Sequence, residues 1–307
     1  MARQTTVESA RSFPWTSAKR FCWEAKDPTP LFFLAAMPTL FSYAVLGSVL
    51  HAQKTPELFV SLHRAVANLS PREKPIGSAY ARGFICHYAL DSTMHPFVYA
   101  QQYALCDAGI DGLTREDGRD VHALIESSFD EMILFVKTGE TIATYHPWER
   151  ILGASDEVLS IISKLYQSMA TAIWGKSIPR DLFTRAVKGY RRMQRMLYSP
   201  QDGKRALIAS IEKLVRHHSF YNAMSHRVVE ATSSPFGNHD HHAWKNPFTG
   251  AVRTDDFWDL YQGAQELARK FIAAFDKPDF SLEQARDLTQ GINFSGRNLR
   301  QLSDEAS

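Results

Sequence analysis

The stretch that decides the fold of this chain is GFICHYALDSTMHPF, residues 83–97. It contains His87, Asp91 and His95 at steps of four residues. On an α-helix each step of four turns the next side chain by only about 40°, so the three side chains share one face. All three are residue types that bind metal ions. The stretch therefore predicts a helix that carries a metal site.

A second pair of ligand-type residues follows in the sequence VHALIESSFDEM. His122 and Glu126 are again four residues apart, which places them on one face of a second helix. Two helices that carry imidazoles and carboxylates at this spacing are typical of a metal centre inside a helical bundle. His51 could supply one more imidazole from an earlier segment of the chain.

The length of the first pattern indicates two ions. From His87 to His95 a helix rises about 12 Å, at about 1.5 Å per residue, which is too far for both imidazoles to bind one ion comfortably. Asp91 lies midway, and catalytic metal pairs sit about 3.5–4 Å apart, a distance that one carboxylate can bridge. We therefore expect His87 and His95 to bind different ions, with Asp91 near or between them. A bound metal would also remove the cost of a carboxylate among apolar neighbours.

Helix signals run through the rest of the chain. Thr55-Pro56 predicts a capped helix start, and Ser281 with Gln284 has the form of a capping box. Alternating β-branched runs are nearly absent. We expect a single all-α domain over residues 1–307, with the metal cluster between helices. The expected helices cover about residues 77–95, ended or kinked by Pro96, and about 118–138, 156–173, 179–197, 204–230, 254–275 and 281–290.

Composition limits the class of protein. Of the 307 residues 44 % are hydrophobic and 22 % charged, as in a globular protein with a large core. A formal net charge of +2 gives no case for a nucleic-acid partner. Three scattered cysteines, and an N-terminus without a secretory signal, predict a cytoplasmic protein. The uncharged segment 28–53 is long enough to span a membrane, but Pro38 and several hydroxyl residues favour buried core helices.

Other patterns give weaker signals for chemistry. His239, His241 and His242 lie in the long unpatterned stretch 233–254, where they could contact substrate or bind a metal. An exposed polar loop is the simpler interpretation of that stretch. The chain has no P-loop, no GxGxxG motif after a strand and no GxSxG elbow. The metal pattern is therefore the clearest indication of chemistry in this sequence.

The metal pattern resembles the signature of the bacterial zinc-dependent phospholipase C family, which belongs with the P1-type single-strand nucleases in an all-helical superfamily. That signature is a His-x3-Asp, closely followed by another His, and then a His-x3-Glu on a later helix. Looser likenesses are the apolar stretch LFFLAAMPTLFSY and the stretch WKNPFTGAVRTDDFWDLYQGA, so the similarity covers roughly residues 30–275. The residues that match the signature are His87, Asp91, His95, His122 and Glu126, with His51 similar to the family's earlier ligand.

The resemblance implies the hydrolysis of a phosphodiester, in a small molecule or a phospholipid, by water activated on zinc. Zinc lowers the pKa of bound water towards about 7 and neutralises phosphoryl oxygens, which agrees with this chemistry. The resemblance implies two ligand sets with Asp91 as a bridge. One ion would be bound by His51 and His87, and the other by His95, His122 and Glu126.

The chain departs from the family pattern in two places. Secreted members bind a further zinc through a processed N-terminal amine and a nearby histidine. This chain begins at Met1 and its first histidine is His51, so we expect that third site to be absent or differently built. Thr39 stands where the family often has an aspartate that binds metal or activates water. Asp130, one turn beyond Glu126, could replace that catalytic base.

Two alternatives stay open from the sequence. The same scaffold could hold iron or manganese, including for redox chemistry, as di-iron helical bundles do. The chain could also be a non-catalytic protein that keeps a metal for stability. In that case four protein ligands and no open coordination position are expected at each ion.

Overall fold

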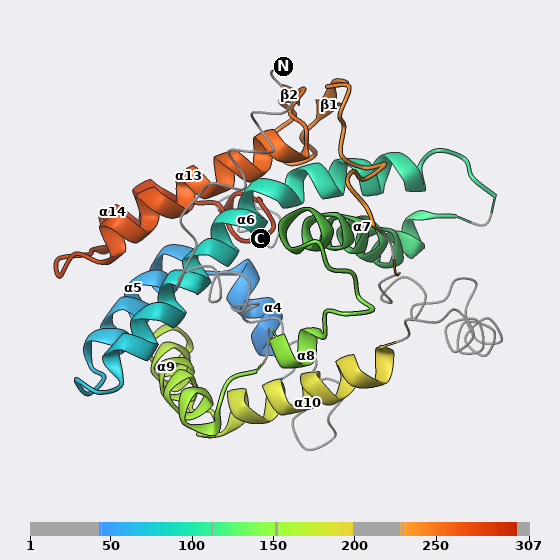
Figure 1. Cartoon of the computed structure of the whole chain (residues 1–307). Coiled ribbons are helices and arrows are strands. Elements are labelled where there is room, and N and C mark those ends of the chain that lie inside the picture. The colour runs from blue at the N-terminus through green and yellow to red at the C-terminus, as the bar shows by residue number, and fades with distance from the viewer. Residues whose placement is uncertain are drawn as a thin grey trace.

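The computed structural model describes residues 45–111, 113–150, 153–198 and 230–299, together with residues 43 and 228. This part of the chain is almost entirely helical and carries one short hairpin, so the prediction of an all-α fold is confirmed (Figure 1). In chain order the elements are α4 (Val45–Ala52), α5 (Thr55–Ala67), α6 (Lys74–Cys106), the 3-10 helix η3 (Arg115–Asp117), α7 (Gly118–Thr138), α8 (Pro147–Arg150), α9 (Asp156–Trp174), α10 (Leu182–Leu197), β1 (Trp244–Lys245), β2 (Val252–Arg253), α13 (Phe257–Phe275) and α14 (Leu282–Thr289).

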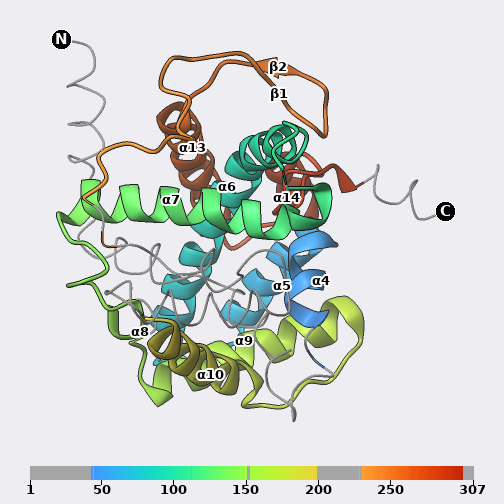
Figure 2. The same cartoon turned by 90° about the vertical axis from the view of Figure 1, so that its right-hand side faces the viewer.

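The long helix α6 is the axis around which the described helices are arranged. It packs against α5, α7, α9 and α13. Figures 1 and 2 show α5 and α9 beside the first half of α6, and α7 beside its second half. A helix that contacts others along its whole length can carry functional side chains that face several neighbours at once. The GFICHYALDSTMHPF stretch lies in the middle of this helix.

Helix α6 continues through Pro96 to Cys106, so of the two outcomes predicted at this proline, an end or a kink, the end is wrong. Proline cannot donate a hydrogen bond to the carbonyl of Ser92, and its ring crowds that carbonyl. In the fold, both groups lie against Gly296. A Cβ added to Gly296 would come within 2.4 Å of Pro96 Cγ and 3.1 Å of the Ser92 oxygen. A side chain at residue 296 would clash with both groups, so glycine is required there for the loop after α14 to pack against the proline.

Apolar side chains form two clusters that both include part of α6. The first cluster involves α5, α9, α10, α13 and α14 and includes Phe84 and Tyr88 of α6. The second lies between α6, α7 and the start of α13, and its first member on α6 is Met94. The ligand-type residues of α6 therefore occupy the interval between two hydrophobic cores. Polar groups at such a place need partners, because burying them unpaired is costly.

Most helix ends follow the signals in the sequence. Helix α7 spans the predicted residues and ends at Gly139, whose φ of 71° is the left-handed conformation that glycine adopts readily. The capping box of Ser281 and Gln284 at α14 is confirmed. At α5 the prediction is wrong by one residue. Lys54, with a φ of 52°, occupies the N-cap, and Thr55 is already helical.

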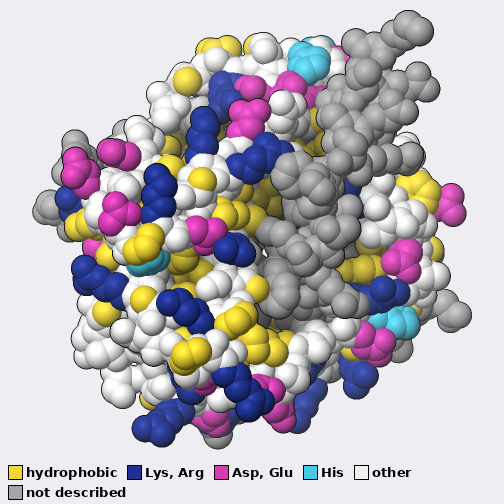
Figure 3. Space-filling model, turned by 60° about the vertical axis from the view of Figure 1, so that its left-hand side comes forward, with side chains coloured by type: hydrophobic (Ala, Val, Ile, Leu, Met, Phe, Trp, Pro, Cys, Tyr) yellow, Lys and Arg dark blue, Asp and Glu magenta, His cyan; other side chains and the backbone are white. Residues whose placement is uncertain are grey.

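Several predictions concern residues outside the described part of the chain. Residues 28–42, including Thr39, and nearly all of the expected helix 204–230 are among them. Within the described ranges, no helix combines the length and the apolar character that a membrane crossing requires. On the face drawn in Figure 3, Lys and Arg side chains are interspersed with Asp and Glu side chains. That face has the mixed charge of an ordinary solvated surface.

Candidate metal centre

Helices α4 and α6 bring together His51, His87 and Asp91, which we call group A. Each of the three offers one ligand atom, and these atoms lie within 4.8 Å of one another. The Nε2 atoms of His51 and His87 are 3.3 Å apart, and Asp91 Oδ2 is 3.5 Å from His87 Nε2. The sequence pattern thus predicted correctly that these residues meet, including His51 from a separate helix.

The ring of His51 is oriented for binding a cation through Nε2. Its Nδ1–H donates a hydrogen bond of 2.8 Å to the carbonyl of Gly47, one helical turn earlier. Because a carbonyl can only accept, the proton of the neutral ring is fixed on Nδ1 and the lone pair on Nε2. Burial, opposed by that hydrogen bond, lowers the pKa of His51 to about 4. The imidazole is therefore neutral at pH 7, as a metal ligand must be.

Helices α6 and α7 bring together His95, His122 and Glu126, which we call group B. Their ligand atoms also lie within 4.8 Å of one another. Glu126 Oε1 is 3.3 Å from the Nε2 atoms of both histidines. Both Nδ1 atoms are held by acceptors. His95 Nδ1–H donates to the carbonyl of Phe294 at 2.7 Å, and His122 Nδ1–H donates to Gln102 Oε1 at 2.9 Å.

Group B attracts positive charge. Burial by itself lowers the pKa of His95, but the negative charges of Asp91 and Glu126 and two hydrogen bonds outweigh it and raise the pKa to about 9. Partial burial raises the pKa of the half-exposed Glu126, but hydrogen bonds from His122 and His95 hold that pKa well below its usual range. A proton thus occupies His95 when no other cation is bound. A metal ion would supply the same positive charge in place of that proton.

Asp91 connects the two groups. Its Oδ2 lies 3.5 Å from His87 Nε2 in group A and 3.9 Å from His95 Nδ1 in group B. The two histidines are one turn before and one turn after it on α6. Asp91 is therefore a member of group A that also faces the Nδ1 side of His95, whereas the Nε2 atom of His95 faces Glu126, so a position of Asp91 between two ions stays a prediction.

The donor sets fit two divalent ions. Each group consists of two imidazoles and one carboxylate, the ligand types that zinc accepts. Each supplies three protein ligands, which leaves a coordination position for water or substrate. Three of the four imidazoles have an oriented Nδ1, as is usual for metal-binding histidines.

The sequence did not reveal the residues that orient these ligands. Phe294, in the loop 291–299 after α14, accepts the hydrogen bond from His95, and its backbone N–H donates to the carbonyl of His51 at 3.2 Å. Its fully buried ring lies 4.9 Å from the ring of His51 and 5.5 Å from that of His87, between centroids. Gln102 is nine-tenths buried beside His122. Phe294 stands at no spacing that indicates its role, and the partner of Gln102 is on another helix.

The other predicted site residues are outside both groups. Asp130 follows Glu126 by one turn on α7, and its role as a base stays a prediction. His239, His241 and His242 are in the loop before β1 and contribute no ligand atom to either group. The Nε2 atom of His239 is buried and has no hydrogen-bond partner among the described residues.

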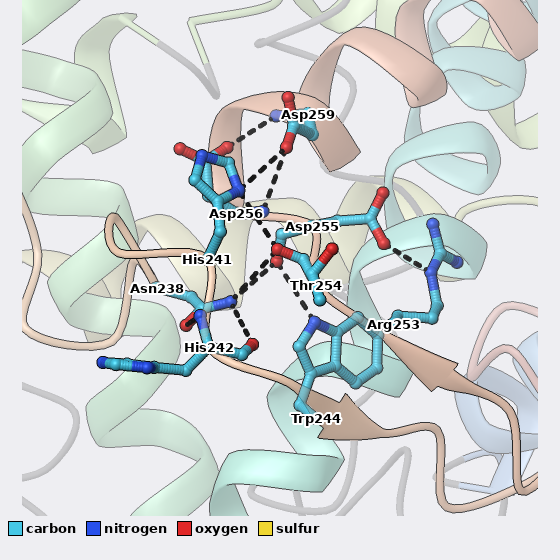
Figure 4. A network of polar contacts seen from close by, with 9 residues as sticks. All are labelled: Asn238, His241, His242, Trp244, Arg253, Thr254, Asp255, Asp256 and Asp259. Carbon is cyan, nitrogen blue, oxygen red and sulfur yellow. Dashed lines mark hydrogen bonds and ion pairs between the residues drawn. The ribbon is translucent and has the colours of Figure 1, made fainter.

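The loop before β1 is held by its own polar network (Figure 4). Asn238 Nδ2 donates to the carbonyl oxygens of His242 at 3.0 Å and Asp255 at 3.1 Å. His241 Nδ1–H donates to the carbonyl of Thr254 at 3.1 Å. Figure 4 shows the rings of His241 and His242 pointing in different directions. These contacts give the loop a structural order that the sequence, read as an unpatterned stretch, did not predict.

Comparisons of the chain with protein-family models, with curated protein sequences and with solved structures each gave no match. The likeness to the zinc-dependent phospholipase C family therefore rests on the ligand pattern quoted above. The function has to be argued from the chemistry of groups A and B.

Proposed function

We propose that the protein is a metal-dependent phosphodiester hydrolase of the zinc-dependent phospholipase C type, with one zinc ion in each group. The observation that supports this most strongly is the joining of two groups of the same donor composition on one helix, with Asp91 between them. Pairs of metal ions held close together are characteristic of enzymes that hydrolyse phosphate esters. By the resemblance, the substrate is a small-molecule or phospholipid phosphodiester.

The charges of the site suit a phosphodiester. The candidate ligands are two carboxylates, Asp91 and Glu126, and four imidazoles, which would be neutral once they bound metal. Two divalent ions would leave an excess of two positive charges, which favours a singly negative phosphodiester and the further negative charge of its transition state. Bound zinc would supply a water of lowered pKa and positive charge for the phosphoryl oxygens.

The protein's own groups hold and orient this site. Gly47, Phe294 and Gln102 accept the Nδ1 protons of three histidines, so each ring presents Nε2. Glu126 keeps 48 % of its side chain exposed, which leaves one side of group B accessible to solvent and substrate. The base that accepts the proton of the attacking water is assigned to Asp130 by position only, since Thr39 cannot act as a carboxylate.

A second candidate function is a redox enzyme. Two histidines and one carboxylate also form the ligand set of mononuclear non-haem iron sites, and each group has that composition. Manganese accepts similar ligands. A purely structural metal is less compatible with these ligand sets. Structural zinc has four protein ligands, whereas each group has three among the described residues.

Metal analysis and a phosphodiesterase assay test the proposal. We expect about two zinc ions per chain in the purified protein, and hydrolysis of bis(4-nitrophenyl) phosphate or phosphatidylcholine that chelation abolishes and zinc restores. His87→Ala and Asp91→Ala should each abolish activity. Iron in place of zinc would favour the redox candidate. The proposal fails if the zinc-loaded protein hydrolyses neither substrate, or if both variants keep full activity.

A further inference from the structure

An arginine lies against two aromatic rings beside group B. The ring of Tyr99 is 4.8 Å from that of His122 and 5.3 Å from that of Phe248, between centroids. The guanidinium carbon of Arg297 is 5.7 Å from the centroid of Tyr99 and 4.8 Å from that of Phe248. We call Tyr99, Phe248 and Arg297 the Arg297 cluster. Its residues come from α6, from the turn between β1 and β2, and from the loop 291–299.

The backbone on both sides of the cluster is held firmly. The buried Asn293 accepts a hydrogen bond from Arg297 N–H through Oδ1 at 3.0 Å, and its own N–H donates to the Arg297 carbonyl at 2.9 Å. In the hairpin turn, Asn246 Oδ1 accepts from Phe248 N–H at 2.9 Å. An arginine that is fixed at its backbone and lies over two rings loses little further freedom when it binds a ligand.

The charge of Arg297 is available for a ligand. Among the described residues, no carboxylate lies within ion-pair distance of its guanidinium, and its recorded side-chain contacts are the two aromatic faces. Most other arginines with recorded contacts pair with acids, as Arg82 does with Asp276 and Arg286 with Glu57. Arg297, Tyr99 and Phe248 are only partly buried, so the cluster is accessible.

We infer that Arg297 binds an anionic group carried by the substrate next to its scissile phosphodiester, so that the enzyme prefers substrates with an acidic head group over those with a cationic one. This inference rests on the proposed function and names its substrate class. Guanidinium binds carboxylate or phosphate through two parallel hydrogen bonds, and stacking on aromatic rings leaves its N–H edges free to do so.

The same geometry argues against a quaternary ammonium head group such as choline. Aromatic side chains bind such cations through their ring faces. Here the guanidinium of Arg297 already occupies the faces of Tyr99 and Phe248. A second cation would meet a like charge instead of an open aromatic cage. Phosphatidylcholine should therefore be a poorer substrate than an acidic phosphodiester.

The inference is tested with three 4-nitrophenyl phosphodiesters that differ only in the second alcohol: glycolate, ethanol and choline. The wild-type, zinc-loaded protein should show a kcat/KM about tenfold higher for the glycolate ester than for the ethyl ester, and the lowest value for the choline ester. Arg297→Gln should remove this order, and Arg297→Lys should keep part of it as a point charge. Arg64→Gln, an exposed arginine on α5, is the matched control and should keep the full order.

Binding measurements separate this inference from the proposed function. Isothermal titration calorimetry with the non-hydrolysable phosphonate analogues of the glycolate and choline esters should give the same order of affinities, again dependent on Arg297. If the order is seen in binding but no ester is hydrolysed, the hydrolase proposal fails and the anion site stands. If the esters are hydrolysed with the same ratios in wild type and Arg297→Gln, or if the choline analogue binds best, the inference about Arg297 is wrong.

Discussion

Groups A and B have the same donor composition but opposite affinities for a proton. In group A, burial lowers the pKa of His51 to about 4, so this imidazole stays neutral. In group B, the charges of Asp91 and Glu126 outweigh burial and raise the pKa of His95 to about 9. Desolvation dominates the pKa of His51, whose ring meets another imidazole and an apolar ring. Coulomb attraction dominates the pKa of His95, whose ring lies near two carboxylates. The two groups should therefore respond differently to mutation and to pH.

The groups also differ in their access to solvent. His87 and Asp91 of group A keep 13 % and 18 % of their side chains exposed, and the histidines of group B are similarly buried, but Glu126 of group B keeps 48 % exposed. Phe294 packs against the histidines of group A, while the partly exposed Tyr99 lies next to His122 in group B. A substrate would thus approach from the side of group B. Group A would bind its ion in the more enclosed part of the site.

The largest effect is expected from Asp91→Asn, because Asp91 belongs to group A and its carboxylate also lies 3.9 Å from His95 Nδ1 of group B. The substitution keeps the size of the side chain and removes its charge, so both groups should lose metal affinity. We expect fewer than two zinc ions per chain and a loss of activity of more than about 100-fold, since changes in residues behind the ligands alone cost about 10–100-fold in affinity. Elemental analysis and the phosphodiesterase assay measure both.

Glu126→Gln is the matched comparison for Asp91→Asn. It removes a charge from group B only, so one zinc ion per chain should remain. If Asp91→Asn also retains one tightly bound ion, with the affinity of group B unchanged, then Asp91 belongs to group A alone and does not connect the groups.

A large effect on stability is expected from Phe294→Ala. The side chain is fully buried, and its removal should lower the free energy of unfolding by about 3–5 kcal/mol. Phe271→Ala is the control, because Phe271 is equally buried in the same core and its recorded ring contacts are to Phe59, Tyr88 and Phe280. Both variants should unfold at lower urea concentration, but only Phe294→Ala should also weaken zinc binding. Equal zinc affinity in the two variants would show that Phe294 merely packs.

The metal-free protein should lose stability on both sides of about pH 6.5. His95 has its pKa raised to about 9, so its contribution is full below pH 6.5 and is lost as the pH rises towards 9. His51 has its pKa lowered to about 4, so the folded state resists its protonation and stability falls as the pH drops from 6.5 towards 4. Urea unfolding of the chelated protein across this range tests the two slopes.

Two variants assign these slopes to the groups. His95→Gln should flatten the alkaline side and leave the acid side, and His51→Gln should do the reverse. A profile that neither substitution alters would contradict the assignment of opposite charge preferences to the two groups.

The ligands themselves could be predicted from the sequence because each pair lies on one helix. Spacings of four, as from His87 to Asp91 and from His122 to Glu126, translate directly into neighbouring side chains. The boundaries of α7 were predictable for a similar reason, since Gly139 and the helical periodicity are local signals. The continuation of α6 through Pro96 was not predicted, because proline usually ends or kinks a helix and the loop that packs against it, at Gly296, is far away in the sequence.

The residues that orient the ligands could not be predicted. Phe294 and Gly47 act through backbone carbonyls, which every residue has, so no side-chain type marks them. Arg297 meets Tyr99 and Phe248 only because three separate segments converge. Gln102 is a partial exception. It lies seven residues after His95 on α6, on nearly the same face, but its partner is on another helix.

The smallest effect is expected from Gln102→Met, which removes the acceptor for His122 Nδ1–H and keeps a side chain of similar length. Because the Nδ1 anchors of His51 and His95 are backbone carbonyls, Gln102 is the one described anchor that a substitution can delete. The affinity of group B for zinc should fall by about 10–100-fold, while group A keeps its affinity. Gln101→Met, at the neighbouring residue whose amide donates to the carbonyl of Phe236, is the control. Competition titration with a zinc chelator measures the zinc affinities of the two groups. An equal loss of zinc affinity in both groups would mean that they do not bind their ions independently.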